Sequence, residues 1–150
     1  MSVTIQPLEP PQIEAARAVI TAGCLEFFGT LPVDFEDMAD ISKQYAAPAG
    51  TFLVLLDGKR VVGTGAIRRL DAETCELKRL WFLPEYRGRG LGREMAGCLF
   101  EFARAAGYKR IRLDSVPELA AANKLYQRLG FYLIERYHEG HGTIFMGKML

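Results

Sequence analysis

The most informative stretch of this chain is Pro84-Glu85-Tyr86-Arg87-Gly88-Arg89-Gly90-Leu91-Gly92. It follows a strand-like run, residues 75–83, and precedes apolar residues at helical spacing over 91–106. Three glycines at a strand-to-helix junction let the backbone approach a ligand and turn its N–H groups toward one point. Since the positive end of the helix dipole lies beside them, we expect a phosphate or diphosphate here. The alternative is a loop whose glycines serve only a tight turn.

The glycine spacing excludes two common phosphate-binding loops. A dinucleotide loop has the pattern Gly-x-Gly-x-x-Gly, and after Gly88 and Gly90 the third position is Arg93. After Gly90 and Gly92 it is Met95. A nucleoside triphosphate loop needs Gly-x-x-x-x-Gly-Lys-Ser/Thr, a string that the sequence does not contain.

Outward from the loop, hydrophobic periodicity predicts the remaining elements. Strands are expected at residues 2–6, 51–56, 60–70, 75–83, 110–114, 131–136 and 143–149. Helices are expected at 12–28, 33–44, 91–106 and 118–129. This order predicts an α/β fold of the mixed α+β kind, a mostly antiparallel twisted sheet of about seven strands with about four helices on its two faces. Because no linker or repeat interrupts the pattern, residues 1–150 are expected to form a single domain.

Composition narrows the class of protein. The 150 residues are 49% hydrophobic and carry 19 Lys plus Arg against 18 Asp plus Glu, which excludes low-complexity disorder and argues against a nucleic-acid partner. The N-terminus lacks a signal-peptide pattern and the longest apolar run is too short to cross a bilayer, so no membrane partner is expected. Three cysteines at 24, 75 and 98 cannot form a complete disulfide framework, which indicates a cytoplasmic location.

Two motifs resemble a known family. Arg87-Gly88-Arg89-Gly90-Leu91-Gly92 matches the Arg/Gln-x-x-Gly-x-Gly/Ala signature of the GNAT superfamily of acetyl-CoA-dependent N-acetyltransferases. Residues 80–86 look like the strand that leads into that signature, and residues 122–131, Ala-Asn-Lys-Leu-Tyr-Gln-Arg-Leu-Gly-Phe, are similar to the family's later helix and turn. The resemblance covers residues 51–136, whereas the first 50 residues match only in being two helices after a strand.

The resemblance implies the GNAT fold with acetyl-CoA as cosubstrate and no metal. It implies transfer of the acetyl group to a primary amine of a small molecule or peptide by direct attack in a ternary complex, by a monomer or homodimer. The residues expected to bind the cofactor are Trp81, Phe82, Leu83, Arg87, Gly88, Arg89, Gly90, Gly92, Arg93 and Asn123.

These cofactor residues have different expected roles. The loop N–H groups hold the diphosphate, Arg93 adds charge at the helix start, and Arg87 braces the loop. The backbone of residues 81–83 binds pantetheine and the thioester oxygen. Relatives often carry an Asn seven residues before the family's tyrosine, where this chain has Leu119. Asn123 is therefore expected to supply the polar contact to CoA.

Acylation of an amine needs a base, because an ammonium has no lone pair with which to attack. Glu76 is the first candidate, on the strand beside the cofactor, and Glu73 is the weaker one. Strand alternation places Glu76 on one face with residues 78 and 80. The alternative role for Glu76 is an ion pair with Lys78 or Arg68.

The general acid that protonates the departing CoA thiolate is expected to be Tyr126. The resemblance places it at the tyrosine of the Leu-Tyr-x-x-x-Gly-Phe pattern, and its alternative role is a plain core tyrosine. His138 and His141 form His-Glu-Gly-His, which departs from zinc-protease spacing and favours a loop or a pocket lining over a metal site.

The acceptor is left open by the sequence. Acidic residues at 34, 36, 37 and 40 in the second helix could attract a cationic acceptor or form a solvated face. Arg68, Lys78 and Arg79 could instead bind an acceptor carboxylate. Three functions therefore compete: an N-acetyltransferase, an acyl-CoA-binding regulatory module without turnover, and an interaction module that uses Arg110 and Arg112. Glu76 together with Tyr126 favours the first.

Overall fold

A mixed sheet forms the centre of the structure, a computed structural model that describes residues 2–31 and 36–150. Its seven strands in these residues have the order β1-β2-β3-β4-β5-β7-β6, and all neighbours are antiparallel except β4 and β5. The strands are β1 (Val3–Pro7), β2 (Thr51–Asp57), β3 (Arg60–Arg69), β4 (Thr74–Phe82), β5 (Arg110–Ser115), β6 (Tyr132–Leu133) and β7 (Ile144–Met149). The predicted class and sheet are thereby confirmed.

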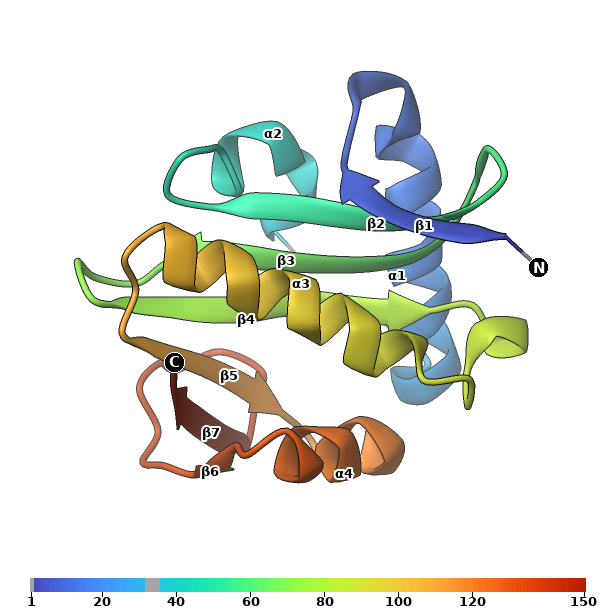
Figure 1. Ribbon diagram of the computed structural model, residues 1–150. Helices are drawn as coiled ribbons and strands as arrows, with labels where there is room; N and C mark the ends of the chain where they lie inside the picture. Colours follow the sequence, from blue (N-terminus) through green and yellow to red (C-terminus); the bar gives the residue numbers. More distant parts are fainter. Residues whose placement is uncertain (1, 32–35) are drawn as a thin grey trace.

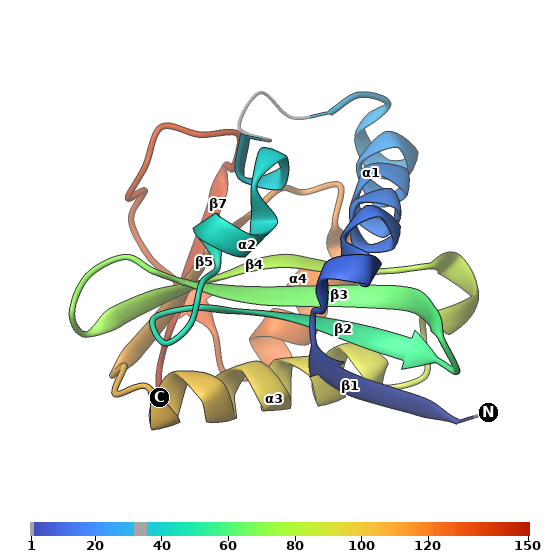
Figure 2. The same cartoon turned by 90° about the horizontal axis from the view of Figure 1, so that it is seen from above.

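Helices cover both faces of the sheet (Figures 1 and 2). The α-helices are α1 (Ile13–Phe28), α2 (Ile41–Gln44), α3 (Leu91–Ala105) and α4 (Ala120–Arg128). Short 3-10 helices lie at η1 (Pro10–Gln12), η2 (Glu36–Ala39) and η3 (Pro84–Tyr86). Figure 2 shows α1 and α2 on one side of the sheet and α3 on the other. Two apolar cores result, one under α3 and α4 and one under α1 and α2, and their burial is the main force that holds the layers together.

Two predicted elements differ from those observed by more than two residues at one end. The helix expected over 33–44 appears as η2 followed by α2, and its first residues lie outside the described ranges. The strand expected over 131–136 is paired only as β6, Tyr132–Leu133. Arg136 donates instead to the carbonyl oxygens of His138 and Gly142, so the segment 135–142 folds back on itself. That segment lies on the α1 side of the sheet (Figure 2).

A bulge in β4 overturns the expected alternation of its side chains. Ala66 pairs with Lys78 but Thr64 pairs with Trp81, so β4 contains one extra residue. Arg79 takes the left-handed conformation there, with φ 57°, and its carbonyl accepts a 2.7 Å hydrogen bond from Thr64 Oγ1. Because the faces exchange at the bulge, Leu80 packs in the α3 core and not beside Glu76, and Trp81 packs against the α1 core.

The parallel strands β4 and β5 part halfway along their length. Their register runs from Thr74 opposite Arg110 to Glu76 opposite Arg112 and ends there. Beyond this point β5 continues with β7 through Ser115. The bulge at Arg79 follows the end of this register, so this stretch of β4 has no β5 partner.

Candidate active site

Two cavities meet where β4 and β5 part. The first, of about 450 Å³, is called the loop cavity, and the second, of about 100 Å³, the inner cavity. The loop cavity is lined by Phe27, Leu80, Trp81, Phe82, Tyr86, Arg87, Gly88, Gly90, Leu91, Gly92, Arg93, Leu119, Ala121, Ala122, Leu125, Tyr126 and Arg128. The inner cavity is lined by Cys24, Phe28, Leu77, Lys78, Arg79, Leu80, Trp81, Asp114, Ser115, Val116, Leu119, Tyr126, His141 and Gly142. Leu80, Trp81, Leu119 and Tyr126 line both.

The glycines of the loop cavity serve two different purposes. Gly88 and Gly90 have φ of 73° and 77°, a backbone conformation that L side chains rarely adopt, although a Cβ at either would meet no neighbour. At Gly92 a side chain is disfavoured by lack of space, since a Cβ would lie 3.0 Å from Leu125 Cδ2. Gly90 caps α3, so the unpaired N–H groups and the positive dipole end of a 15-residue helix stand beside the cavity. This arrangement suits a diphosphate.

Arg87 joins the loop to two other elements. Its two terminal nitrogens bond Glu26 at 2.7 and 2.9 Å, and its Nε donates to the Phe82 carbonyl at 3.0 Å. The guanidinium also lies 5.1 Å from the centre of the Phe27 ring. The Arg87 hydrogen bond lowers the pKa of Glu26. Arg87 therefore ties the loop to the end of α1 and to β4.

The structure brings seven of the ten predicted cofactor residues to the loop cavity and leaves three outside it. Leu83 and Arg89 do not line it; Leu83 N–H bonds Val62, and Arg89 lies over the Tyr86 ring. Asn123 does not line it either: its amide oxygen accepts from the Ser115 hydroxyl at 2.5 Å, and its amide N–H donates to the Val116 carbonyl at 3.0 Å.

Sequence reasoning missed other lining residues of the loop cavity. Arg128 follows Tyr126 by two residues, inside the second of the two motifs, so its charge was a usable signal. Phe27 comes from α1, 54 positions before Trp81 in the sequence, and only the packing of α1 on β4 brings it there. Leu119, noted as the departure from the family pattern, lines both cavities.

Tyr126 occupies the junction of the cavities. It is 6% exposed, and its ring packs edge-on against Phe131 with the centroids 5.7 Å apart. Burial, and to a lesser extent the charge of Asp114, raises the pKa of Tyr126 far above that of a free tyrosine. The hydroxyl therefore keeps its proton at neutral pH.

Glu76 lies in a closed environment. It is 0% exposed and lines neither cavity. One carboxylate oxygen accepts from Arg68 Nε at 2.7 Å and the other from the Tyr137 hydroxyl at 2.5 Å. Burial and the Glu76 charge raise the pKa of Tyr137, so its hydroxyl stays a donor. Glu73, the weaker candidate, pairs with Lys109 at 2.7 Å and also lines neither cavity.

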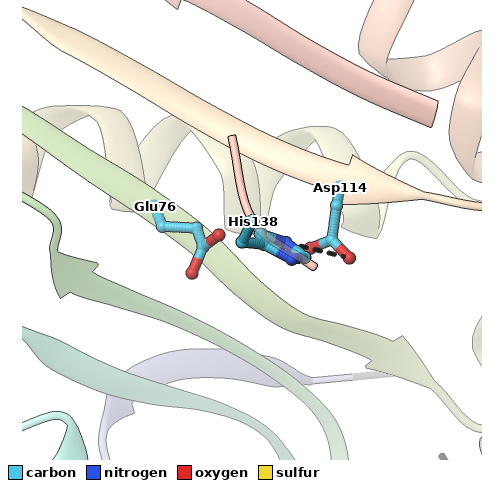
Figure 3. A group of neighbouring side chains, drawn as sticks. All are labelled: Glu76, Asp114 and His138. Carbon is cyan, nitrogen blue, oxygen red and sulfur yellow. Dashed lines mark ion pairs between the residues drawn. The ribbon is translucent and has the colours of Figure 1, made fainter. Parts of the chain in front are cut away.

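Glu76, Asp114 and His138 form a cluster next to the inner cavity (Figure 3). One potential ligand atom from each lies within 4.8 Å of the others. However, His138 Nδ1 accepts a 2.8 Å hydrogen bond from Gly140 N–H, which places the proton of the neutral ring on Nε2. A metal on Nε2 would need the opposite tautomer, with an N–H facing the Gly140 N–H. The donor set does not fit a metal ion.

The inner cavity carries both signs of charge. Lys78, Arg79 and Asp114 line it, and His141 packs edge-on against Phe28 at its wall. Of the acidic residues expected near the acceptor, residue 34 lies outside the described ranges. Asp40 caps α2 by accepting from the Lys43 N–H at 3.2 Å. Of the basic residues expected there, Lys78 and Arg79 line this cavity, whereas Arg68 pairs with Glu76; Asp40 does not line it.

The sheet parts between β4 and β5, and the glycine loop and the N-terminus of α3 lie beside this point. This chain belongs to the acetyltransferase (GNAT) family, whose model matches residues 21–131. The resemblance found in the sequence is confirmed.

Relatives and solved structures agree with this assignment. YjgM, an uncharacterized N-acetyltransferase of Escherichia coli, is 34% identical over 102 residues, 66% of this chain and 61% of that protein. N-acetylaspartate synthetase of Danio rerio is 35% identical over 97 residues, 63% of this chain and 34% of that protein. This chain thus spans less than two thirds of the length of both.

Among solved structures, an acetyltransferase of Streptococcus agalactiae superposes with a TM-score of 0.86 at 26% identity, covering 99% of this chain and 98% of that one. A PaiA N-acetyltransferase of Thermoplasma acidophilum, in complex with coenzyme A, superposes with a TM-score of 0.80 at 16% identity and covers both chains fully, 100% of each. No helix within the described residues is long and apolar enough to span a membrane.

Proposed function

We propose that this chain transfers an acetyl group from acetyl-CoA to a primary amine of a small molecule or peptide, by direct attack in a ternary complex. The observation that carries the proposal is the meeting of two cavities at Tyr126. The loop cavity offers glycine N–H groups and a helix N-terminus to a diphosphate, and the inner cavity offers polar side chains to an acceptor. The CoA bound to the Thermoplasma acidophilum structure supports this use of the fold.

The loop cavity positions the cofactor in three parts. The N–H groups of the glycine loop would hold the diphosphate, with Arg93 and Arg128 adding positive charge at the wall. Pantetheine would lie along β4 past Glu76, where the register with β5 has ended. A backbone N–H of this stretch would donate to the thioester oxygen and stabilise the negative charge that develops on it.

The groups that move protons are Tyr126 and a carboxylate. Tyr126 would protonate the CoA thiolate, since it lines both cavities and retains its proton. The base predicted from the sequence is Glu76. Its enclosure by Arg68 and Tyr137 means that it could reach an amine only if Tyr137 moves or a water relays the proton.

The acceptor that the inner cavity favours is an amine that also carries a carboxylate. Lys78 and Arg79 line this cavity and can pair with such a group. The name of the relative N-acetylaspartate synthetase supports an amino-acid acceptor for this site as well.

We further propose a cytoplasmic monomer or homodimer without a nucleic-acid or membrane partner. Cys75 and Cys98 are free thiols, as a reducing compartment would maintain them, and the formal net charge is only +1.

Calorimetry and a CoA-release assay test the proposed function. Acetyl-CoA should bind, whereas ATP, NAD and RNA should not, and release of CoA should require one amine of a panel of amino acids, polyamines and lysine peptides. Absence of acetyl-CoA binding would refute the proposal. Binding without release of CoA for every amine would favour the regulatory module, which the enclosed position of Glu76 makes the second candidate.

A further inference from the structure

Asp114 is a carboxylate that faces the inner cavity. It precedes the last residue of β5, and its side chain is 13% exposed. It is the one acidic residue among the described residues that line this cavity, and Tyr126 lines the same cavity on the cofactor side. An amine placed to attack a thioester at the junction would therefore have Asp114 as its neighbouring carboxylate, and not Glu76.

Two side chains approach the carboxylate oxygens of Asp114, but neither forms a short hydrogen bond with them. Lys78 Nζ lies 4.0 Å from Oδ1, the outer limit of an ion pair, and His138 Nε2 lies 3.5 Å from Oδ2. Figure 3 shows the His138 ring between the two carboxylates, with the contact to Asp114 dashed. This differs from Glu76, whose two oxygens each accept a short hydrogen bond. Asp114 thus retains capacity for a further cation or proton.

His138 is oriented to support Asp114 and not to act as a base itself. Its Nδ1 is occupied by Gly140 N–H at 2.8 Å, so Nε2 carries the proton. Nε2 is buried and makes no hydrogen bond to any residue that the structure describes. Edge contacts with Tyr137 and Phe145, with centroids 5.0 and 5.1 Å apart, fix the ring. The nearby Asp114 oxygen is the group toward which this buried N–H can donate.

The segment that carries His138 also closes over Asp114. A Cβ at Gly142 would lie 2.2 Å from Asp114 Oδ2, so only glycine lets the chain pass this close to the carboxylate. The backbone is held by Arg136, which bonds the carbonyl oxygens of His138 and Gly142. Asp114 therefore lies in a preorganised polar pocket.

We propose that Asp114, positioned by His138, binds the ammonium group of the acceptor and accepts the proton that must leave before the nitrogen can attack. This inference rests on the proposed acetyl transfer and identifies a further catalytic residue for it. His138 is a positioning residue, because it acts through Asp114.

The step balances with the groups already named. One N–H proton of the acceptor passes to an Asp114 oxygen, and the freed lone pair forms the C–N bond at the thioester carbon. The C–S bond breaks with its electron pair on sulfur, and Tyr126 protonates the thiolate. A second N–H proton restores the Tyr126 hydroxyl as the amide forms, and Asp114 returns its proton to solvent.

The test compares Asp114→Asn with Glu76→Gln, using the best amine of the panel. Asp114→Asn should lower kcat/KM by about 100-fold or more, the usual contribution of a general base, and leave acetyl-CoA affinity within about twofold. Glu76→Gln should lower it by no more than about tenfold, as expected for a residue that only holds the surroundings in place. Glu135→Gln, which removes an exposed carboxylate, is the matched control and should keep wild-type activity.

Two further comparisons separate chemistry from structure. Hydroxylamine is neutral at neutral pH and needs no deprotonation before attack, so Asp114→Asn should lose far less rate with it than with an ammonium acceptor. His138→Leu should lower kcat, and His138→Gln, which retains an N–H donor, should restore most of it.

The outcomes are distinguishable. Turnover by Asp114→Asn at more than half of the wild-type rate, in a protein that binds acetyl-CoA normally, would overturn the assignment of Asp114 and leave the proposed function standing. Equal losses of rate with hydroxylamine and with ammonium acceptors would overturn that assignment as well. Absence of turnover by the wild type with every amine would overturn both proposals.

Discussion

Gly23, in the middle of α1, should resist the substitution that usually stabilises a helix. A Cβ added at Gly23 would lie 2.3 Å from Cε3 and 2.8 Å from Cζ3 of Trp81. Trp81 lines both cavities and is flanked by Phe27 and Phe28, with ring centroids 6.1 and 6.2 Å away. Since ordinary carbon contacts are about 3.5–4.0 Å, the indole would have to move by more than about 1 Å.

The expected free energies follow from two opposing terms. Gly→Ala inside a helix normally stabilises by about 0.8–1.0 kcal/mol, whereas overpacking a core costs about 1–3 kcal/mol. Gly23→Ala should therefore range from neutral to destabilising by about 2 kcal/mol. Gly97→Ala is the matched control in α3, because Gly97 is exposed and its added Cβ would meet nothing within 4 Å. It should gain about 0.8–1.0 kcal/mol.

Urea unfolding followed by circular dichroism measures both free energies. Trp81 is the one tryptophan of the chain, so its fluorescence reports the displaced ring directly in Gly23→Ala and should not change in Gly97→Ala. The acetyl-transfer rate should fall only in Gly23→Ala, since Trp81 lines both cavities. Equal stabilisation by both substitutions, with an unchanged emission spectrum, would refute the steric argument.

Three further predictions concern the loop cavity and the ion pair that holds its loop. Tyr126→Phe keeps the buried ring but removes the proton donor, so kcat should fall by about 100-fold. Calorimetry should show an unchanged affinity for acetyl-CoA. An unchanged kcat would exclude Tyr126 as the general acid. Arg87→Ala should weaken acetyl-CoA binding about tenfold, because the loop loses its bonds to Glu26 and Phe82. Arg87 lowers the pKa of Glu26 in the folded protein. The pair therefore stabilises the fold fully at a pH above the ordinary carboxyl pKa. This stabilisation is lost as the pH falls through the lowered pKa of Glu26 and the carboxylate is protonated. The stability difference between wild type and Glu26→Gln should therefore shrink in acid; a constant difference would contradict the pairing.

Local sequence signals predicted most of the fold. Gly29 ends α1 with φ 72°, as its position after the helical run indicates, and the Asp57-Gly58 turn joins the paired strands β2 and β3. The glycine loop and the helix after it follow from residues adjacent in the chain. These features depend on neighbours in sequence, which is why they could be predicted.

The strand faces beyond Lys78 could not be predicted in this way. Alternation assumes a regular strand, but the extra residue at Arg79 makes the following side chains exchange faces. The hydrogen bond that the Thr64 hydroxyl on the neighbouring strand donates to the Arg79 carbonyl holds this bulge in place. The surroundings of Glu76 were equally hidden, because Tyr137 reaches it from 61 positions away in the sequence.

The order of elements, the glycine loop and the two motifs can be predicted from the sequence, because turn chemistry and periodicity are local properties. Which carboxylate is enclosed and which faces a cavity depends on the packing of segments that are distant in the sequence. Glu76 is covered because the 135–142 segment folds back over the sheet, and Asp114 lines the inner cavity because β4 and β5 part beside it. Both are acidic residues on neighbouring strands, and packing between distant segments gives them different surroundings.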